Sequence, residues 1–209
     1  MLKSYRTVSG ETENTEIIEK SRFITYIKNV ENEEQAKEFV AKIKKQHSLA
    51  THNCYAYIAD KEGNVQKFSD DKEPQGTAGM PMLETLKSLG LTEVCAVVTR
   101  YFGGIKLGTG GLARAYSGGV KNCADKCKIK DLYLSYVNRM EMDFTLYGKF
   151  VSFNGSLNGF KVIATDFGEN VKVTFAVKED VAEKTESALS AFFAKNIELE
   201  KDQIIYTDF

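Results

Sequence analysis

The chain has 209 residues, of which 43% are hydrophobic and 27% are charged, and its formal net charge is −1. This composition is ordinary for a globular protein and allows one large domain or two small ones, each with a normal core. A net charge so close to zero says nothing about partners, and no segment approaches the roughly 18 apolar residues of a membrane span.

The N-terminal part of the chain shows strand and helix patterns in alternation. Strands are predicted at residues 3–9 and 21–30, and Asn32 with Gln35 three positions later gives a capping signal for a helix. The remaining elements expected here are strands at 53–59, 65–69 and 94–102, a helix that starts near Pro81 and ends at Gly90, and a helix at 112–126.

The pattern restarts after residues 126–131, which read as a linker. The elements expected beyond it are strands at 133–145, 161–166, 171–177 and 197–206, and helices at 147–157 and from 179 onward. This β-α-β-β-α-β order is that of ferredoxin-like domains. We therefore expect an α+β protein of two domains, residues 1–130 and residues 131–209.

The two halves differ in charge. Residues 1–130 carry 20 Lys and Arg against 16 Asp and Glu, whereas residues 131–209 carry 8 against 13. Between residues 94 and 130 Asp125 is the only acid, and the basic residues are Arg100, Lys106, Arg114, Lys121, Lys126, Lys128 and Lys130. A local basic field of this kind suits phosphate, although the four C-terminal lysines fit a solvated helix face equally well.

The cysteines and the N-terminus bear on the cellular compartment of the protein. Cys54, Cys95, Cys123 and Cys127 form no Cys-x-x-Cys pair, which favours free thiols in a reducing cytosol. The N-terminus also lacks the apolar segment of a signal peptide. We expect a cytoplasmic protein without a membrane partner. The sequence leaves the oligomeric state open and favours a monomer.

Residues 99–111 form the most informative stretch, because a β-branched run enters a glycine-rich loop that leaves as a helix. This arrangement brings bare backbone N–H groups up to an anion. The candidate anion- or RNA-binding residues are Arg100, Gly103, Gly104, Lys106, Gly108, Gly110, Gly111 and Arg114. The loop lacks the Gly-Lys-Ser/Thr ending of a triphosphate-binding loop, and its glycines could also serve close packing alone.

A second group of polar residues supports an alternative. Asp70, Asp71 and Glu73 could hold a magnesium ion, with His52 as acid or base and Cys54 beside it on the same strand face. The plainer interpretation is an Asx-type turn next to a structural histidine and a buried cysteine. We favour the plainer interpretation and assign no catalytic residue, metal or cofactor.

Several motifs resemble the YigZ/IMPACT family. They are Lys20-Ser-Arg-Phe-Ile, Ala50-Thr-His-Asn-Cys-Tyr-Ala-Tyr, Ser69-Asp-Asp-Lys-Glu-Pro-Gln-Gly-Thr-Ala-Gly, and the long run from Val98 through the glycine-rich loop to Tyr116. The resemblance covers roughly residues 1–130 by motif, and the C-terminal half resembles the smaller domain of bacterial members by pattern and position. Lys72 departs from the family's usual glycine, and Met80 replaces a basic residue found in several members.

The resemblance implies a fold and a context. It implies an N-terminal ribosomal-protein/elongation-factor-type mixed sheet with helices on one face, and a C-terminal ferredoxin-like domain similar to the last domain of elongation factor G. Eukaryotic members regulate translation, whereas bacterial members have no settled biochemical activity.

Two hypotheses follow from the residues and the resemblance together. The first is a non-catalytic module that binds RNA or a ribosome-associated partner, with stacking from Tyr101, Phe102 or Tyr116. The second is an enzyme that acts with magnesium on a phosphorylated or nucleotide-like small molecule. The enzyme hypothesis requires His52 and the acidic loop to reach one pocket with the glycine-rich loop.

Overall fold

A computed structural model describes all residues of the chain, 1–209, and they form two compact units. The large unit is Tyr5–Lys130, and the small unit combines Met1–Ser4 with Asp131–Phe209. Within the small unit the N-terminal residues are held by hydrogen bonds, because the Leu134 N–H donates to the Lys3 carbonyl and the Tyr206 hydroxyl donates to the Leu2 carbonyl. None of the helices is long and apolar enough to cross a membrane.

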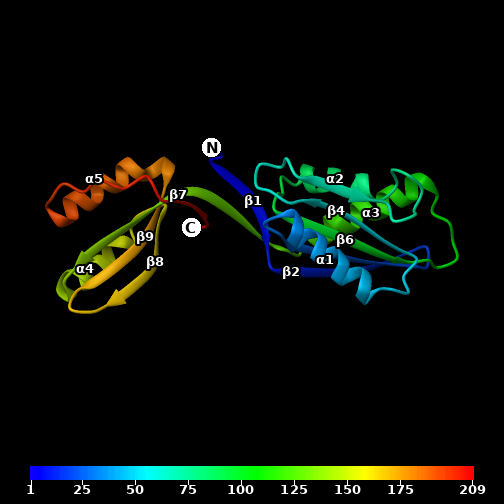
Figure 1. Cartoon of the computed structure of the whole chain (residues 1–209), viewed down its shortest axis with the longest axis horizontal. Helices are drawn as coiled ribbons and strands as arrows, with labels where there is room; N and C mark the ends of the chain where they lie inside the picture. The colour runs from blue at the N-terminus through cyan, green and yellow to red at the C-terminus, as the bar shows by residue number, and fades with distance from the viewer. The chain divides into compact units, whose positions relative to one another are not determined.

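The large unit is built on a five-stranded sheet in the order β2-β3-β6-β4-β5, and every neighbouring pair is antiparallel (Figure 1). The strands are β2 (Glu11–Ile18), β3 (Ser21–Asn29), β4 (His52–Ile58), β5 (Gln66–Ser69) and β6 (Val94–Tyr101). The helices are α1 (Glu33–Gln46), α2 (Gly79–Ser88) and α3 (Gly108–Ala124). A further strand, β1 (Ser4–Ser9), makes a parallel bridge from Arg6 to Leu91.

Helices cover both faces of this sheet, because its central strands are apolar on both sides. Phe23 and Ile27 of β3 belong to a core shared with α2 and α3, whereas Ile24 and Tyr26 of the same strand belong to a core shared with α1. Alternate residues of a strand point to opposite faces, so each face needs its own cover. The α+β class is therefore confirmed, but the sheet is antiparallel rather than mixed, and its helices lie on two faces rather than one.

Several predicted elements form within a few residues of the expected bounds. The Asn32 side chain accepts a hydrogen bond from the Gln35 N–H at 2.9 Å, as the capping signal predicts. Three differences stand out. β2 was not predicted, α3 begins four residues earlier than expected, and the predicted linker already contains the start of β7 (Lys128–Met142).

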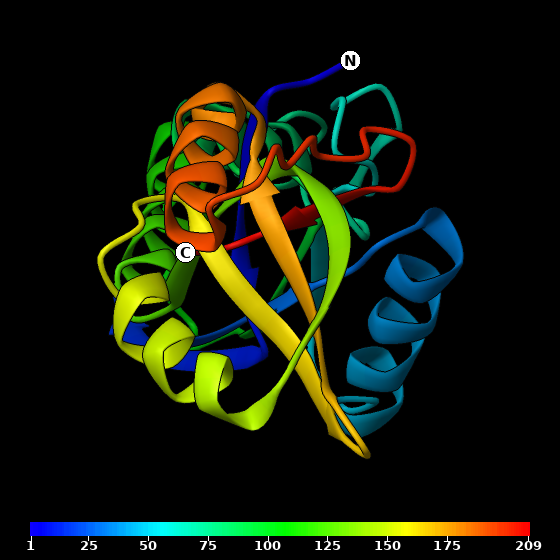
Figure 2. The ribbon, with the colours of Figure 1, turned by 90° about the vertical axis from the view of Figure 1, so that its left-hand side faces the viewer.

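The small unit has the predicted β-α-β-β-α-β order. β7 pairs β9 (Val171–Lys178) and β10 (Ile204–Thr207), and β9 pairs β8 (Phe160–Phe167), all antiparallel. Helices α4 (Phe144–Asn154) and α5 (Ala182–Phe193) lie on one side of these strands (Figure 2), and a 3-10 turn, η1 (Glu179–Val181), precedes α5. Their common core centres on the buried Phe150, Phe175 and Leu189.

β10 is shorter than the predicted strand. The preceding segment contributes Leu199 to the core, and the Asn138 side chain pairs with both backbone groups of Glu200, at 2.7 and 3.0 Å. Side-chain hydrogen bonds thus replace a strand ladder there, although the apolar residues of the segment are buried as a strand pattern would suggest.

Candidate anion-binding site

The glycine-rich loop connects the end of β6 to the start of α3, and its glycines have different reasons to be glycine. Gly104 and Gly108 have φ angles of +88° and +70°, which favour glycine. A Cβ on Gly103 would lie 2.0 Å from the Lys20 carbonyl carbon, so this position requires glycine for close packing. A Cβ on Gly110 would meet only the Arg114 side chain, at 3.5 Å. Packing alone therefore explains Gly103 but not Gly110.

A surface pocket of about 440 Å³ lies at this loop. Its lining residues are Ile18, Glu19, Ile105, Lys106, Leu107, Gly111, Arg114 and Ala115. The structure thus brings Lys106, Gly111 and Arg114 together, as the sequence predicted. Sequence reasoning missed Glu19, which has a φ angle of +45° in the turn between β2 and β3. A non-glycine residue at positive φ leaves no distinctive sequence signal.

The electrostatics of this pocket favour an anion. Lys106 and Arg114 are exposed and make no ion pair within the chain, so both charges are free to meet a ligand. The first turn of α3 has no side-chain cap and no acidic residue. Its N–H groups and the positive end of its dipole are therefore uncompensated. Glu19 is the only acid in the lining, which leaves one net positive charge.

Arg100 does not belong to this surface, contrary to the prediction. It is buried, and its Nη1 donates to the Glu73 carboxylate at 2.7 Å. The Tyr116 hydroxyl donates to the same carboxylate oxygen at 2.8 Å. Arg100 pairs within the fold because it lies in a central strand whose side chains are all buried up to that position.

The buried Glu73–Arg100 ion pair is nevertheless connected to the glycine-rich loop by hydrogen bonds. The second guanidinium nitrogen of Arg100 donates to the Ser21 hydroxyl oxygen at 3.3 Å, and the Gly103 N–H donates to the same oxygen at 3.1 Å. Ser21 is therefore the link between the Glu73–Arg100 pair and the first glycine of the loop. Its position in the Lys-Ser-Arg-Phe motif was the only sequence signal for this role.

The two aspartates of the acidic loop accept hydrogen bonds from other groups of the fold. The Asp70 carboxylate accepts from the N–H groups of Gly76, Ala78 and Gly79 at 2.8 to 3.0 Å, which caps the start of α2. Asp71 accepts from the Asn53 N–H at 2.6 Å and from Lys44 at 3.2 Å. No three Asp, Glu, His or Cys side chains come together as metal ligands. The Asp70 carboxylate therefore binds loop N–H groups, as the plainer interpretation expects, but these lie six to nine residues further along the chain rather than within a local Asx turn.

The turn also explains why glycine is usual at position 72. Asp71 and Lys72 have φ angles of +43° and +73°, so both adopt the left-handed conformation. This conformation favours glycine, which is the residue the family usually has there, and a lysine is strained in it. The tight turn forms nonetheless.

His52 and Cys54 do not form a nucleophilic pair. The His52 ring lies 2.9 Å from the Asp71 carbonyl oxygen through Nδ1 and 3.7 Å from the Glu73 carboxylate through Nε2. The Cys54 thiol donates to the Asp70 carbonyl oxygen at 3.0 Å, and burial raises the pKa of this thiol. None of His52, Asp70, Asp71 and Glu73 lines the glycine-loop pocket.

One of the three aromatic candidates is available for stacking. Tyr116 is buried, and Tyr101 is half-buried with its hydroxyl 2.9 Å from Nδ1 of His47. Phe102 is 47% exposed, with the Arg100 guanidinium 5.4 Å from its ring centre. A base could therefore stack on Phe102 alone.

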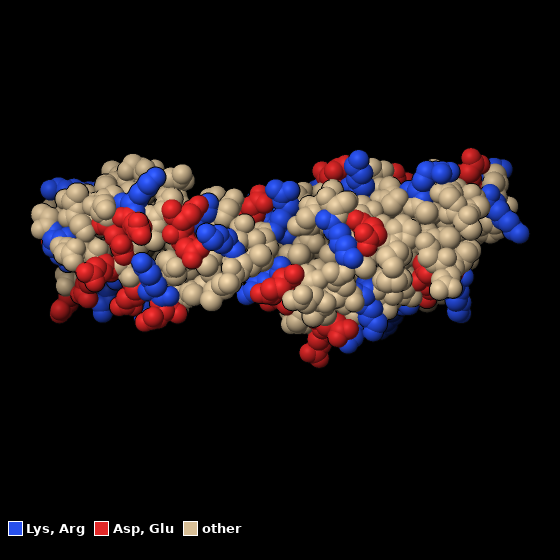
Figure 3. Space-filling view, turned by 90° about the horizontal axis from the view of Figure 1, so that it is seen from above, with Lys and Arg blue, Asp and Glu red and all other residues tan.

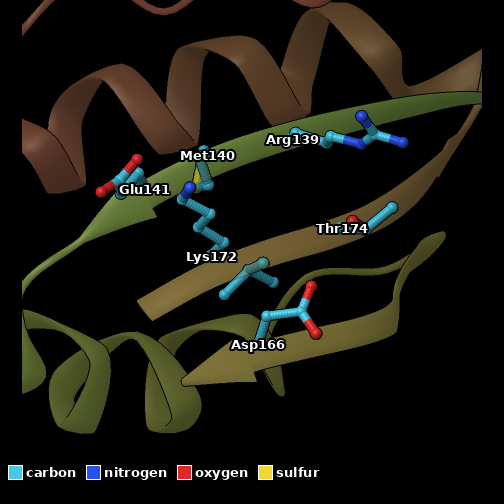
Figure 4. Close-up of a pocket in the computed structure, with 7 residues that line it drawn as sticks. Arg139, Met140, Glu141, Asp166, Lys172 and Thr174 are labelled. Atoms are coloured by element: carbon cyan, nitrogen blue, oxygen red, sulfur yellow. The ribbon is translucent and has the colours of Figure 1, made fainter. Parts of the chain in front are cut away.

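A second pocket, of about 520 Å³, lies on the small unit (Figure 4). Asp166 of β8, Lys172 and Thr174 of β9, and Arg139 and Glu141 of β7 line it. Lys172 is the register partner of both Asp166 and Glu141. Two cations and two carboxylates balance each other there, so this pocket has no net charge to attract an anion. The face drawn in Figure 3 likewise mixes Lys and Arg with Asp and Glu.

Two protein-family models match different parts of the chain. Residues 19–124 match the Impact N-terminal domain, and residues 140–194 match a domain of unknown function, DUF1949. The chain is 50% identical over 149 residues to IMPACT family member YvyE of Bacillus subtilis, which covers 71% of this chain and 69% of that protein. It is 51% identical over 107 residues to IMPACT family member YigZ of Escherichia coli, which covers 50% and 52%.

Solved structures give a further comparison. A crystal structure described as a hypothetical protein aligns over 100% of this chain and 98% of its own, with 30% identity and a TM-score of 0.62. A structure described as the two-domain translational regulator Yih1 aligns over 56% of this chain and 46% of its own, with 22% identity and a TM-score of 0.33. The first structure supports the two-unit fold, whereas the TM-score of the second is too low for a comparison of folds.

Proposed function

Because the chain belongs to the IMPACT family, we propose that it is a non-catalytic binding protein linked to translation regulation, and that it holds RNA phosphates at the glycine-rich loop. The link to translation comes with the family resemblance. The matched segment is about half of YigZ, so the activity of a whole relative does not transfer by itself.

One observation carries the choice of an anionic ligand. Lys106 and Arg114 line one pocket, both are exposed and unpaired, and the adjoining helix start is uncapped. Unpaired cations beside free N–H groups are the usual elements of a phosphate site. The apolar side chains of Ile18, Ile105 and Leu107 in the same lining give a sugar or base a surface to contact.

The enzyme alternative has less support. It needs His52 and the acidic loop in the same pocket as the glycine-rich loop, and neither lines it. The Asp70 carboxylate already caps α2, and Glu73 already pairs with Arg100. A general acid or base must reach the substrate, and of these groups Glu73 is buried while His52 and Asp70 are only partly exposed.

Fluorescence anisotropy with a labelled single-stranded oligouridylate tests the proposal. Phosphate contacts make binding to single strands fall with salt at about 0.7 in log K per log salt for each contact. The variant Lys106→Ala/Arg114→Ala should therefore bind more weakly and reduce the slope by about 1.4. Oligouridylate affinity that is flat with salt, or unchanged in this variant, would contradict the proposal.

A matched control separates the pocket from bulk charge. Lys121 and Lys128 are also exposed, but Lys121 lies in the last turn of α3 and Lys128 is the first residue of β7. The variant Lys121→Ala/Lys128→Ala removes the same charge and should keep most of the affinity and the slope. Equal losses in the two double variants would indicate a diffuse basic surface instead of a site.

A further inference from the structure

The small unit exposes an apolar face that its own core does not use. Phe144 and Val151 of α4 are 54% and 49% exposed, and Ile163 and Phe167 of β8 are 48% and 64% exposed. The rings of Phe144 and Phe167 stack with their centres 6.4 Å apart, so helix and strand contribute to one surface. We call these four residues the α4–β8 face. Exposed apolar side chains that contact each other, as Phe144 and Phe167 do, mark an interaction surface.

The strand in this face is an open edge. β8 pairs only with β9 and makes no backbone hydrogen bond on its outer side, although the Lys161 side chain donates to Thr207 and Asp208 of the C-terminal segment. A bulge between Val162 and Ala164 adds Ile163 to the strand. Natural proteins usually cover or charge such edges, because free N–H and C=O groups recruit another chain. β8 contains only two charged residues, Lys161 and Asp166.

Helix α4 carries a glycine that its own fold does not explain. Gly148 lies inside the helix and is exposed, and a Cβ there would meet no atom within 4 Å. Glycine inside a helix is less favourable than alanine, because it loses more backbone freedom on folding. Neither close packing within the unit nor a positive φ angle accounts for it. A glycine one turn before Val151 does allow a second helix to approach this face closely.

The charges of β8 identify the occupant. Lys161 and Asp166 are opposite Ala176 and Lys172 of β9, positions that lie on one face of the sheet. They are placed symmetrically about the middle of β8, between Ile163 and Ala164. A second β8 running antiparallel therefore sets each Lys161 beside Asp166 of the other copy, whereas a parallel strand sets like charges together. Opposite charges facing each other across strands are stabilising, and like charges are not.

We propose that a second copy of the chain covers the α4–β8 face, with the two β8 strands antiparallel about a two-fold axis. In this register Ile163 and Ala164 lie beside the two-fold axis, the two Lys161–Asp166 pairs lie farther out, and Phe167 with Phe144 lies at each end of the paired strands. A contact that uses the same patch on both partners closes on itself, as in most homodimers. This inference does not depend on the RNA-binding proposal.

Light scattering coupled to size-exclusion chromatography tests it on the full chain. The expected mass is twice that of the 23.4 kDa chain at high protein concentration, with a return to the single-chain mass on dilution. Val151→Asp and Ile163→Lys each change an exposed side chain, so they should preserve the fold by circular dichroism and give monomers. A monomer at every concentration, or a dimer that both variants leave intact, would overturn the proposal.

Charge reversal gives the sharper measurement. Lys161→Glu and Asp166→Lys should each raise the dimer dissociation constant by about tenfold, because each creates two like-charge contacts by symmetry. The double variant Lys161→Glu/Asp166→Lys recreates the opposite-charge pairs and should recover most of the affinity. Lys161 also contacts Asp208 in its own unit, so Asp208→Asn serves as the control and should dimerise normally. No recovery in the double variant would contradict the antiparallel arrangement.

Discussion

The carboxylate of Glu73 lies 2.7 Å from the guanidinium of Arg100, and both side chains are buried beneath the glycine-rich loop. The pair joins the acidic turn to the central strand β6, and Tyr116 ties α3 to the same carboxylate. Ser21 extends this network to the Gly103 N–H. Residues that the sequence suggested for catalysis and for anion binding thus hold each other inside the fold.

Breaking this ion pair should destabilise the large unit strongly. Glu73→Ala or Arg100→Ala leaves an uncompensated buried charge, which costs about 3–5 kcal/mol. Replacing both residues, as in Glu73→Leu/Arg100→Met, should recover much of that loss because no buried charge remains. Urea denaturation of the three variants measures this. A loss below about 1 kcal/mol in the single variants would show that the network is unimportant for stability.

Replacing two glycines of the glycine-rich stretch with alanine should have different effects on stability. Gly103→Ala places a Cβ against the Lys20 backbone and should cost about 3 kcal/mol or more, seen in thermal or urea unfolding. Gly110→Ala has space for its Cβ and should stay within about 0.5 kcal/mol of the parent. If Gly110 lets a phosphate approach the backbone, the same variant should bind oligouridylate about tenfold more weakly. Unchanged affinity for Gly110→Ala would remove this glycine from the site.

Cys127 should be the most reactive thiol of the chain. Interaction with the Cys123 side chain lowers the pKa of Cys127, and Cys127 lines a pocket of about 260 Å³. Burial raises the pKa of Cys54 and of Cys95. Because the thiolate is the nucleophile, iodoacetamide should label Cys127 first and at a lower pH than the other thiols. Peptide mapping checks the order, and Cys127→Ser should abolish the fast phase. Earlier labelling of Cys54 would contradict the assignment.

His47 should make the fold less stable in mild acid. Burial lowers the pKa of His47, whose ring nitrogens lie 2.7 Å from the Tyr26 hydroxyl and 2.9 Å from the Tyr101 hydroxyl. A pKa that is lower in the folded state means that the stabilising contribution is complete above about 6.5 and is lost as the pH falls through the folded value. Urea unfolding between neutral and mildly acidic pH measures this decline. His47→Gln should flatten it, and an equally steep decline in that variant would exclude His47 as its source.

Much of the fold could be predicted because its core elements carry clear periodic patterns. α1 has an apolar stripe and a capping residue, and β6 is a continuous apolar run, so both form where expected. β2 could not be found in this way, because Glu11–Ile18 is largely polar and half-exposed. Hydrophobic alternation marks only strands with a buried face. The antiparallel order and the second covered face depend on long-range pairing, which local patterns do not contain.

The candidate site was predictable in part. The glycines and the unpaired Lys106 and Arg114 were visible because glycine-rich loops and isolated basic residues have a distinctive composition. Arg100 looked equivalent to them in sequence. It lies in a buried strand, however, and forms an ion pair with Glu73. Glu19 comes to the loop from the turn between β2 and β3, and Ser21 from the start of β3, both more than 80 residues earlier. Their involvement follows from the tertiary fold and not from any local motif.

Ultraviolet crosslinking in cell extract, followed by mass spectrometry of nucleotide-bearing peptides, tests the central claim most directly. The account predicts that RNA crosslinks fall on peptides spanning Phe102 and the glycine-rich loop, and that Lys106→Ala/Arg114→Ala reduces them about tenfold or more. Lys121→Ala/Lys128→Ala should leave their yield near that of the parent. Crosslinks confined to other parts of the chain, or an absence of RNA from the purified protein, would contradict RNA binding at this loop.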